Sequence, residues 1–364
     1  MNYLKFFGYF LLVVFLVGCS DEPASSNFDV EQESKLGITP DNLKVKTGEF
    51  TSPLFDLATT PNGDIVVADA GSGIANIYGA TLMALPGVSS IAPIGNGSMW
   101  AITGASGGPS GALIDSGQAI YRVSNGRTRL VANLFKFESS NDSDGHIESN
   151  PYGVASLGGN AALVADAAGN HLIKVDNEGN GTVVATFPNE PVSTSNLKSL
   201  ANCPNPAPFC NLPPMLPAQA VPTSVVVGAD GYFYVGELKG FPAPTGASNI
   251  WKISPNAINA SCGSSADCVK LFNGGFTSIV DMTFGPDGRL YVAEFDERSW
   301  AAVEIFHAGV GGNIKACDTN TLECETIASG INMLTGIAFA KDGSLWATRN
   351  SLIPGQAEVV KVSD

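Results

Sequence analysis

Residues 222–237 read Pro222-Thr-Ser-Val-Val-Val-Gly-Ala-Asp-Gly-Tyr-Phe-Tyr-Val-Gly-Glu237. An apolar strand is followed by a turn centred on Asp230-Gly231, a second apolar strand and a polar residue that ends it. Asp-Gly between alternating apolar runs is the strongest short-range hairpin signal, because both central residues tolerate positive φ. The segment therefore predicts a β-hairpin.

The same pattern recurs along the chain. Five further versions span Phe55–Asp69, Ser90–Thr103, Tyr152–Asp166, Ile279–Glu294 and Thr335–Arg349. In five of the six copies, the polar end residue falls six positions after the turn glycine, and in the third copy Asn160 takes the glycine's place. Six similar hairpins in series indicate a repeat architecture.

The repeats predict an all-β fold, a six-bladed β-propeller with four-stranded antiparallel blades. The chain is rich in glycine (41) and proline (22), which suits short strands and tight turns. Residues 152–187 show a complete unit of four strands. The last unit, 336–362, supplies three strands, so we expect the N-terminal strand Leu43–Thr47 to complete it and close the ring with strands from both termini. The propeller would span 43–364.

The N-terminus resembles a bacterial lipoprotein signal. A lysine precedes the apolar run Phe6–Val17, which is short for a membrane span and ends in Leu16-Val17-Gly18-Cys19. The resemblance implies a signal peptide over 1–19, with Cys19 as the site of lipid attachment and of membrane anchoring. An ordinary signal peptide with a chance cysteine is the alternative. Residues 20–42 read as a flexible acidic tether, and Ser20 favours an outer-membrane or periplasm-facing place in the cell envelope.

The remaining six cysteines predict an oxidising compartment. They form three local pairs, Cys203/Cys210, Cys262/Cys268 and Cys317/Cys324. Fifteen connectivities are possible in principle, and closeness in sequence favours the local ones. Zinc is the competing interpretation, but it prefers shorter Cys spacings and usually a histidine nearby.

The polar residues that end the second strands form the candidate site. In a propeller these strand ends open on the same face as the entries to the innermost strands. We expect a ring around one channel mouth made of Asp69, Thr103, Asp166, Glu237, Glu294 and Arg349, with Asn150 beside it. Such a ring would accept a polar ligand or a divalent cation such as calcium. The alternative is structural, since an acidic residue that closes a strand commonly accepts backbone N–H groups of the following turn.

Composition and motifs exclude several function classes. The formal net charge of −15 and the lack of a basic patch argue against nucleic acid as a partner. His146, His171 and His307 are isolated from one another and from cysteine, so no catalytic triad or metal motif is visible. Neither a nucleophile elbow nor a phosphate-binding loop is present.

Several blocks resemble the ScyD/ScyE family of exported propellers. They are Asn150-Pro-Tyr-Gly-Val, 164–170, 219–225, Val235-Gly-Glu-Leu-Lys-Gly-Phe-Pro242, Phe276-Thr-Ser-Ile-Val-Asp281 and Gly336-Ile-Ala-Phe339. The strand pattern is also similar, more distantly, to NHL-repeat and gluconolactonase-like propellers, which implies a divalent cation held at the channel mouth. The match of Glu237, Glu294 and Asn150 to that set is positional only.

These observations predict a lipid-anchored, exported propeller that binds a protein, glycan or small molecule through its loop-rich channel face, as a monomer. The alternative is a divalent-metal-dependent hydrolase or lactonase at the same mouth. A structural envelope protein without a ligand pocket is the third hypothesis.

Overall fold

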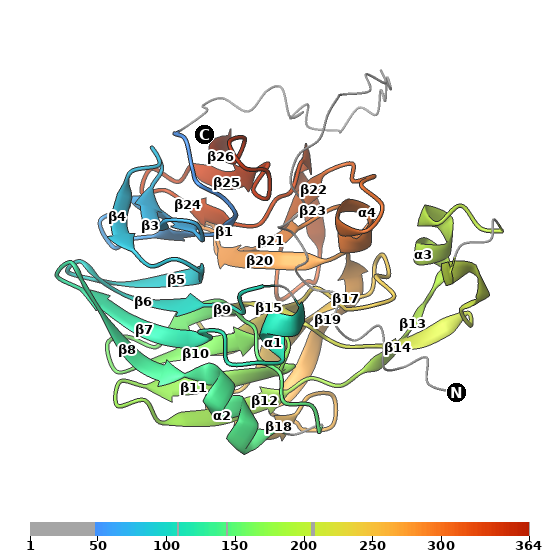
Figure 1. The fold of residues 1–364 in the computed structure, drawn as a ribbon, viewed down its shortest axis with the longest axis horizontal. Helices are drawn as coiled ribbons and strands as arrows, with labels where there is room; N and C mark the ends of the chain where they lie inside the picture. The colour runs from blue at the N-terminus through green and yellow to red at the C-terminus, as the bar shows by residue number, and fades with distance from the viewer. Residues whose placement is uncertain (1–47, 108, 143–144, 205–207, 364) are drawn as a thin grey trace.

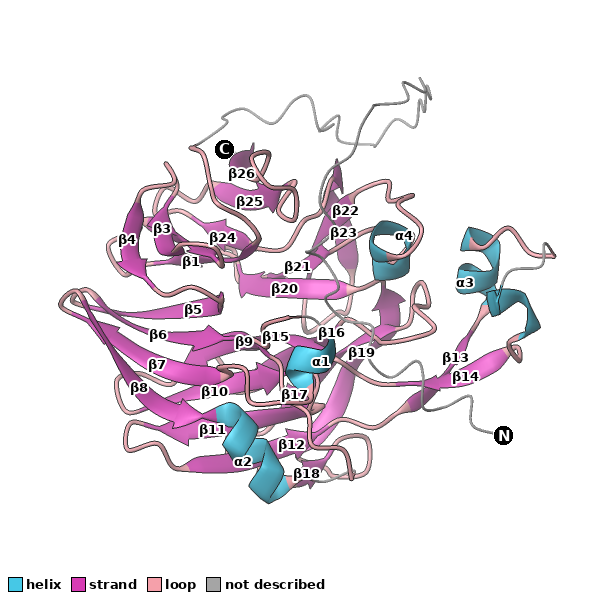
Figure 2. Ribbon diagram, viewed as in Figure 1, coloured by secondary structure: helices cyan, strands magenta, loops and turns pink. Residues whose placement is uncertain are grey.

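The computed structural model describes residues 48–363, except 108, 143–144 and 205–207. Six small antiparallel sheets form a ring, with the innermost strands around its centre (Figure 1). Strands dominate, and the helices are short (Figure 2). Within the described ranges, no helix is both long and apolar enough to cross a membrane. The predicted six-bladed β-propeller is therefore confirmed.

The first three blades follow the chain from the inside of the ring outwards. Blade 1 contains β1 (Leu54–Thr59), β2 (Ile65–Asp69), β3 (Gly73–Asn76) and β4 (Thr81–Ala84). Blade 2 contains β5 (Val88–Gly95), β6 (Ser98–Thr103), β7 (Ala119–Ser124) and β8 (Arg127–Asn133). Blade 3 contains β9 (Pro151–Ser156), β10 (Ala161–Asp166), β11 (His171–Asp176) and β12 (Gly181–Thr186).

The second half of the ring repeats this order. Blade 4 contains β15 (Pro222–Val227), β16 (Phe233–Glu237), β17 (Ser248–Ile253) and β19 (Cys268–Phe276). Blade 5 contains β20 (Ile279–Phe284), β21 (Leu290–Glu294), β22 (Gly312–Cys317) and β23 (Cys324–Ile331). Blade 6 contains β24 (Ile337–Phe339), β25 (Leu345–Arg349) and β26 (Glu358–Ser363).

Blades 3 and 6 depart from the four-stranded pattern. A short strand from blade 4, β18 (Ala260–Ser261), pairs in parallel with β12 and adds a fifth strand to blade 3. This pairing covers the outer edge of blade 3 and ties it to the next blade. Blade 6 has three strands within the described residues, and Leu43–Thr47, expected to complete it, lies outside them.

A long insertion between blades 3 and 4 forms a projecting arm, which we define as residues 188–220. It contains the hairpin β13 (Glu190–Ser193) and β14 (Met215–Ala218), helix α3 (Ser195–Leu200) and the 3-10 turn η2 (Pro208–Asn211). The hairpin extends to the right of the ring in Figure 1 and carries α3 at its end. Phe209 joins this end to the blade-5 loop, since its ring centroid is 5.8 Å from that of Phe306.

The hairpin turns differ in one detail from the expectation. Asn96 and Gly97 both have positive φ, as a two-residue turn requires. In the Asp230-Gly231 turn only the glycine has positive φ, +79°. The reason is a longer loop, in which Gly228 N–H donates to Tyr232 O and Gly231 N–H to Gly228 O. The carboxylate of Asp230 also accepts the N–H of Tyr232, so aspartate serves the turn through its side chain.

Three disulfides join the predicted local pairs, Cys203–Cys210, Cys262–Cys268 and Cys317–Cys324. The first lies in the arm. The second links the segment that contains β18 to β19, and the third links β22 to β23 across their turn. Disulfides persist in oxidising compartments, so they favour an exported protein.

Candidate functional site

The two faces of the ring carry different kinds of connection. The first and second strands of each blade are joined at what we call the turn face, marked by Gly63, Gly97, Gly231, Gly288 and Gly343. The opposite face, the loop face, holds the ends of the second and fourth strands, from which the insertions leave. These include α1 (Pro109–Ala112), α2 (Leu134–Asn141), the arm and α4 (Trp300–Glu304).

Two predicted site residues on the loop face serve the local backbone. Asp69 accepts the N–H and hydroxyl of Thr51, at 2.8 and 2.6 Å. Asp166 accepts the N–H of Asn150 at 2.7 Å and the hydroxyl of Ser149 at 2.6 Å. Both also accept an N–H of the turn that follows the strand. Asp69 and Asp166 therefore act as acceptors for the local chain, as expected if their role is structural.

Other predicted site residues are also held by nearby protein groups. The Thr103 hydroxyl donates to Gly117 O at 2.6 Å, and Arg349 pairs with Glu358 at 2.5 Å. Glu294 accepts the N–H of Thr277 and pairs with Lys315. The Asn150 side chain accepts the N–H of Ala105 at 2.8 Å.

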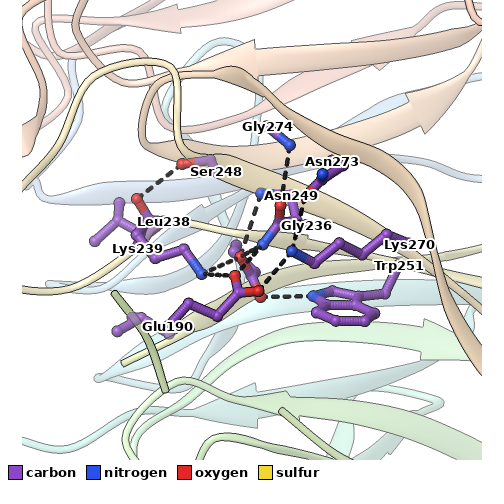
Figure 3. Close-up of polar contacts among 12 residues, drawn as sticks. Glu190, Gly236, Leu238, Lys239, Ser248, Asn249, Trp251, Lys270, Asn273 and Gly274 are labelled. Atoms are coloured by element: carbon purple, nitrogen blue, oxygen red, sulfur yellow. Dashed lines mark hydrogen bonds and ion pairs between the residues drawn. The ribbon is translucent and has the colours of Figure 1, made fainter. Parts of the chain in front are cut away.

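Glu237 belongs to a buried charged network between blade 4 and the arm. Figure 3 labels other members of this network, among them Glu190, Lys239 and Asn249. Its carboxylate accepts the indole N–H of Trp251 at 2.5 Å and the side-chain amide of Asn249 at 2.7 Å. It also pairs with Lys239 at 2.7 Å, and both side chains are fully buried. Burial raises the pKa of Glu237, and the charge of Lys239 opposes that rise.

Glu190 brings the arm into this network. It accepts hydrogen bonds from Lys239 at 2.8 Å, Lys270 at 2.5 Å and Asn249 at 2.7 Å (Figure 3). Burial pushes the pKa of Glu190 upwards, but these cationic and amide donors outweigh it and lower the pKa to about 2. The network therefore anchors the arm to blade 4, with the lysines matched by carboxylates.

The four strand-end carboxylates do not meet as one cation site. Across the described parts of the chain, no group of three or more His, Cys, Asp or Glu side chains is arranged to hold a metal ion. Cys19, the predicted site of lipid attachment, lies outside those parts.

A different site lies in the central channel. A cavity of about 410 Å³ is lined by the innermost strands of all six blades, β1, β5, β9, β15, β20 and β24. At its inner end, Phe55, Tyr152 and Val280 are buried and belong to the same apolar cluster as Trp300 of α4. Towards the turn face, lining residues such as Thr59 and Phe284 are partly exposed. The cavity is therefore closed beneath the loop face and accessible from the turn face.

Two aspartates line the inner part of this cavity, Asp56 of β1 and Asp281 of β20. The Asp56 carboxylate accepts the Ser90 hydroxyl at 2.7 Å and the N–H of Ile91 at 2.9 Å, both from blade 2. The Asp281 carboxylate accepts the N–H of Met282 and, from blade 6, the N–H of Ile337, both at 2.7 Å.

Burial raises the pKa of both aspartates. The pKa of Asp56 rises from 3.8 to about 6, against the lowering effect of its hydrogen bonds to Ser90 and Ile91. The pKa of Asp281 rises well above its usual value, first through burial and then through the negative charge of Asp56. The two groups line the same concave, partly desolvated space.

Tyr152 presents a phenol to the same space. It lines the cavity, is 8 % exposed, and its ring meets Phe55 edge-on with centroids 5.8 Å apart. Burial raises the pKa of Tyr152, and the charges of Glu304, Asp281 and Asp56 add to the rise. A hydroxyl beside a cavity is a group that can form a hydrogen bond with a ligand or with water.

Sequence reasoning missed Asp56, Asp281 and Tyr152 as site residues, although all lie in the repeats. A signal was available. Asp56 and Asp281 each interrupt an apolar inner strand, in Leu54-Phe55-Asp56-Leu57 and Val280-Asp281-Met282. A carboxylate at such a position is costly to bury, so it marks either a structural acceptor or a site.

Comparisons with known proteins add little to this geometry. No protein-family model matches the chain, and no curated protein matches its sequence. Among solved structures, the chain is similar to a structural genomics protein of unknown function from Bacteroides thetaiotaomicron (TM-score 0.49, 11% identity, 86% of this chain and 69% of that chain covered). It is also similar to virginiamycin B lyase from Staphylococcus aureus (TM-score 0.47, 13% identity, 86% of each chain covered). A third structure is a putative oxidoreductase (glucose dehydrogenase) from Thermus thermophilus (TM-score 0.46, 14% identity, 86% and 97% covered). At these TM-scores and sequence identities, the similarity does not indicate the function of the chain.

Proposed function

We propose that this protein is an exported binding propeller that takes a small polar molecule into its central channel from the turn face. The observation that carries the proposal is a cavity of about 410 Å³ that is lined at its inner end by two aspartates and a tyrosine. Cavities of roughly 300–1,000 Å³ with a few convergent polar groups are the usual form of small-molecule sites.

The chemistry of the channel supports a polar occupant. The innermost strands pair with no further strand on their channel side. Backbone groups there that no side chain of an adjacent blade satisfies need water or a ligand. The turn face supports entry, because the lining residues at that end are partly exposed. This differs from the sequence-based expectation of binding through the loop face, where the strand-end residues hold local partners.

A fragment screen by ligand-observed NMR tests the proposal. A library of cationic, neutral and anionic fragments is titrated against the disulfide-bonded protein, and we expect binding from at least one class. Thr59→Cys, labelled with a bulky maleimide, should block the mouth and abolish binding, because Thr59 lines the cavity at the turn face. The same label on Thr128→Cys, in the exposed outer strand of blade 2, should leave binding intact. Binding that survives the label at Thr59, or no binding at all, would overturn the proposal.

A hydrolase is the second candidate. It is favoured by the pKa of about 6 at Asp56, which suits a general acid or base near neutral pH. Lactone and ester hydrolysis by the wild type, compared with Asp56→Asn, tests it. Equal rates in the two proteins would remove this candidate.

Export, lipid anchoring at Cys19 and a relation to ScyD/ScyE propellers complete the proposal. The disulfides support export, and the apolar run Phe6–Val17 with its following cysteine supports the anchor. Mass spectrometry of Cys19 in envelope fractions is the direct test of the anchor.

A further inference from the structure

We infer that the channel selects an organic monocation, a substituted ammonium group held between Asp56, Asp281 and the rings of Phe55 and Tyr152. The inference rests on the proposed channel site and names the chemical class of its ligand. It follows from the charge at the inner end of the cavity, from the aromatic groups there, and from the absence of a metal-binding set among the described residues.

The charge at the inner end of the cavity is negative. Asp56 and Asp281 line it. The described lysines and arginines do not line this cavity. A cation entering the channel would relieve the repulsion between the two aspartates and restore their ionised forms. An anion would meet like charge in a partly desolvated space, so it is excluded on electrostatic grounds.

The aromatic groups distinguish an organic cation from a bare one. Phe55 and Tyr152 lie edge to face at an interplanar angle of 66° where the cavity ends, beside the carboxylates. Aromatic faces attract ammonium groups through the ring quadrupole, and they do so best when the site is desolvated. The Tyr152 hydroxyl adds a lone pair that can accept an ammonium N–H, or contact a polar group beside the cation.

A divalent metal ion fits this end of the cavity less well. The carboxylate oxygens of Asp56 and Asp281 already accept hydroxyl or N–H donors from neighbouring blades. No set of three or more acidic, His or Cys ligands occurs in the described ranges, whereas calcium takes six to eight oxygen ligands. An ammonium group needs only acceptors at its surface and tolerates carboxylates that keep their other hydrogen bonds.

Choline and its neutral isostere 3,3-dimethylbutan-1-ol form a matched pair of probes. They have nearly the same shape and differ in charge, so isothermal titration calorimetry with the disulfide-bonded protein isolates the contribution of the cation. We expect choline to bind at least about tenfold more tightly than the alcohol, with n-butylammonium also binding. Equal affinity of choline and the alcohol would overturn the inference, as would binding of calcium without binding of either ammonium probe.

Three variants locate the binding. Asp281→Asn keeps an acceptor for Ile337 but removes a charge, and Tyr152→Phe keeps the ring but removes the hydroxyl. We expect the first to weaken choline binding about tenfold or more and the second to weaken it less. Asp64→Asn removes the same charge from an exposed position in the blade-1 hairpin turn and should leave binding unchanged. Equal effects of the Asp64 and Asp281 variants would show a general charge effect and overturn the inference.

The proposed channel site and the proposed cation class of its ligand can be disproved independently. If neutral fragments bind in the channel and are blocked by the label at Thr59, while ammonium probes do not bind, the channel site stands and the cation class is wrong. If neither ammonium probes nor fragments bind in the channel, both proposals are wrong. Circular dichroism and thermal unfolding of each variant confirm that the fold is retained.

Discussion

Asp56 and Asp281 occupy equivalent positions in the inner strands of blades 1 and 5. Each pairs with the residue just before the polar end of its second strand, Asp56 with Ala68 and Asp281 with Ala293. Each accepts a backbone N–H from the following blade, from Ile91 and Ile337 respectively. A bulge precedes both positions in the strand register.

Other blades have a residue at the position that Asp56 and Asp281 occupy in blades 1 and 5. Strand register places Ser90, Gly153 and Ser224 at the equivalent positions of blades 2, 3 and 4. Ser90 accepts the N–H of Val154 in blade 3, so it makes the contact between blades that Asp56 makes from blade 1. A serine therefore meets the structural need without a charge. That the chain keeps two aspartates here, at a cost in desolvation, is the reason to look for a ligand.

The pH dependence of stability tests this cost. The pKa of Asp56 is raised from 3.8 to about 6 in the folded protein. The stability that protonated Asp56 contributes is therefore complete below pH 3.8 and is lost as pH rises through about 6. The raised pKa of Asp281 acts in the same direction, and Tyr152 is a further titratable residue that lines the cavity.

Asp56→Asn keeps an acceptor for Ile91 and removes this titration. We expect the variant to be more stable than the wild type by about 1–3 kcal/mol at pH 8, with the difference vanishing near pH 3.5. Urea unfolding across that range measures it. Asp64→Asn, which removes a carboxylate at an exposed position, is the control. A destabilised Asp56 variant at pH 8 would contradict the argument.

The propeller was predictable from the sequence because each hairpin is local. Turn and strands of 222–237 lie within sixteen residues, and the two strands pair as their alternation indicates. The disulfides were predictable for the same reason, since their partners lie six or seven residues apart.

The site was not predictable in the same way, because its contacts join distant segments. Glu237 was placed at a channel mouth, yet its neighbours include Asn249 and Trp251 of the adjacent strand, in a network shared with Glu190. The partner of Asp281 is Ile337, 56 residues away. The packing of one blade on the next decides these contacts, and a single repeat contains no signal for it.

The arm should loosen when Glu190 loses its charge. Glu190→Gln leaves Lys270 without its carboxylate and Lys239 with Glu237 alone. We expect a loss of roughly 1–3 kcal/mol in anchoring and faster hydrogen exchange across residues 188–220. Hydrogen-exchange mass spectrometry measures the effect.

The acid range gives a second readout of the same contact. The pKa of Glu190 is lowered to about 2 from 4.5, so its contribution is complete above pH 4.5 and is lost as pH falls towards 2. In Glu190→Gln this part of the acid dependence should disappear. The exposed Glu178→Gln is the control, and similar behaviour of the two variants would disprove the anchoring role.

The disulfides should differ in their effect on the ring. Cys262–Cys268 is buried beside β18, which covers the edge of blade 3. Cys203–Cys210 lies in the arm. Replacing the first pair by serine should cost about 2 kcal/mol and speed hydrogen exchange in β12. Replacing the second should disturb the arm and leave β12 unchanged. Equal exchange in β12 for both double variants would show that the β18 contact does not stabilise blade 3.

Gly153 tests how closely the blades approach at the level of the aspartates. A Cβ at this position would lie 2.7 Å from Thr223 O and 3.1 Å from the Cα of Ser224, which are backbone atoms of blade 4. Neither can move without shifting an inner strand. Gly153→Ala should therefore cost about 1–3 kcal/mol, the usual effect of overpacking. Gly159→Ala, in the turn of the same blade, would place its Cβ 3.8 Å from the nearest atom, in Arg122, and should be close to neutral.

Because Gly153 occupies the position equivalent to Asp56 and Asp281 in the channel, its alanine variant should also weaken choline binding, by displacing β9 and Tyr152. Calorimetry on the folded variant measures that coupling, and unchanged affinity together with unchanged stability would mean that the ring tolerates a wider spacing than its backbone contacts indicate.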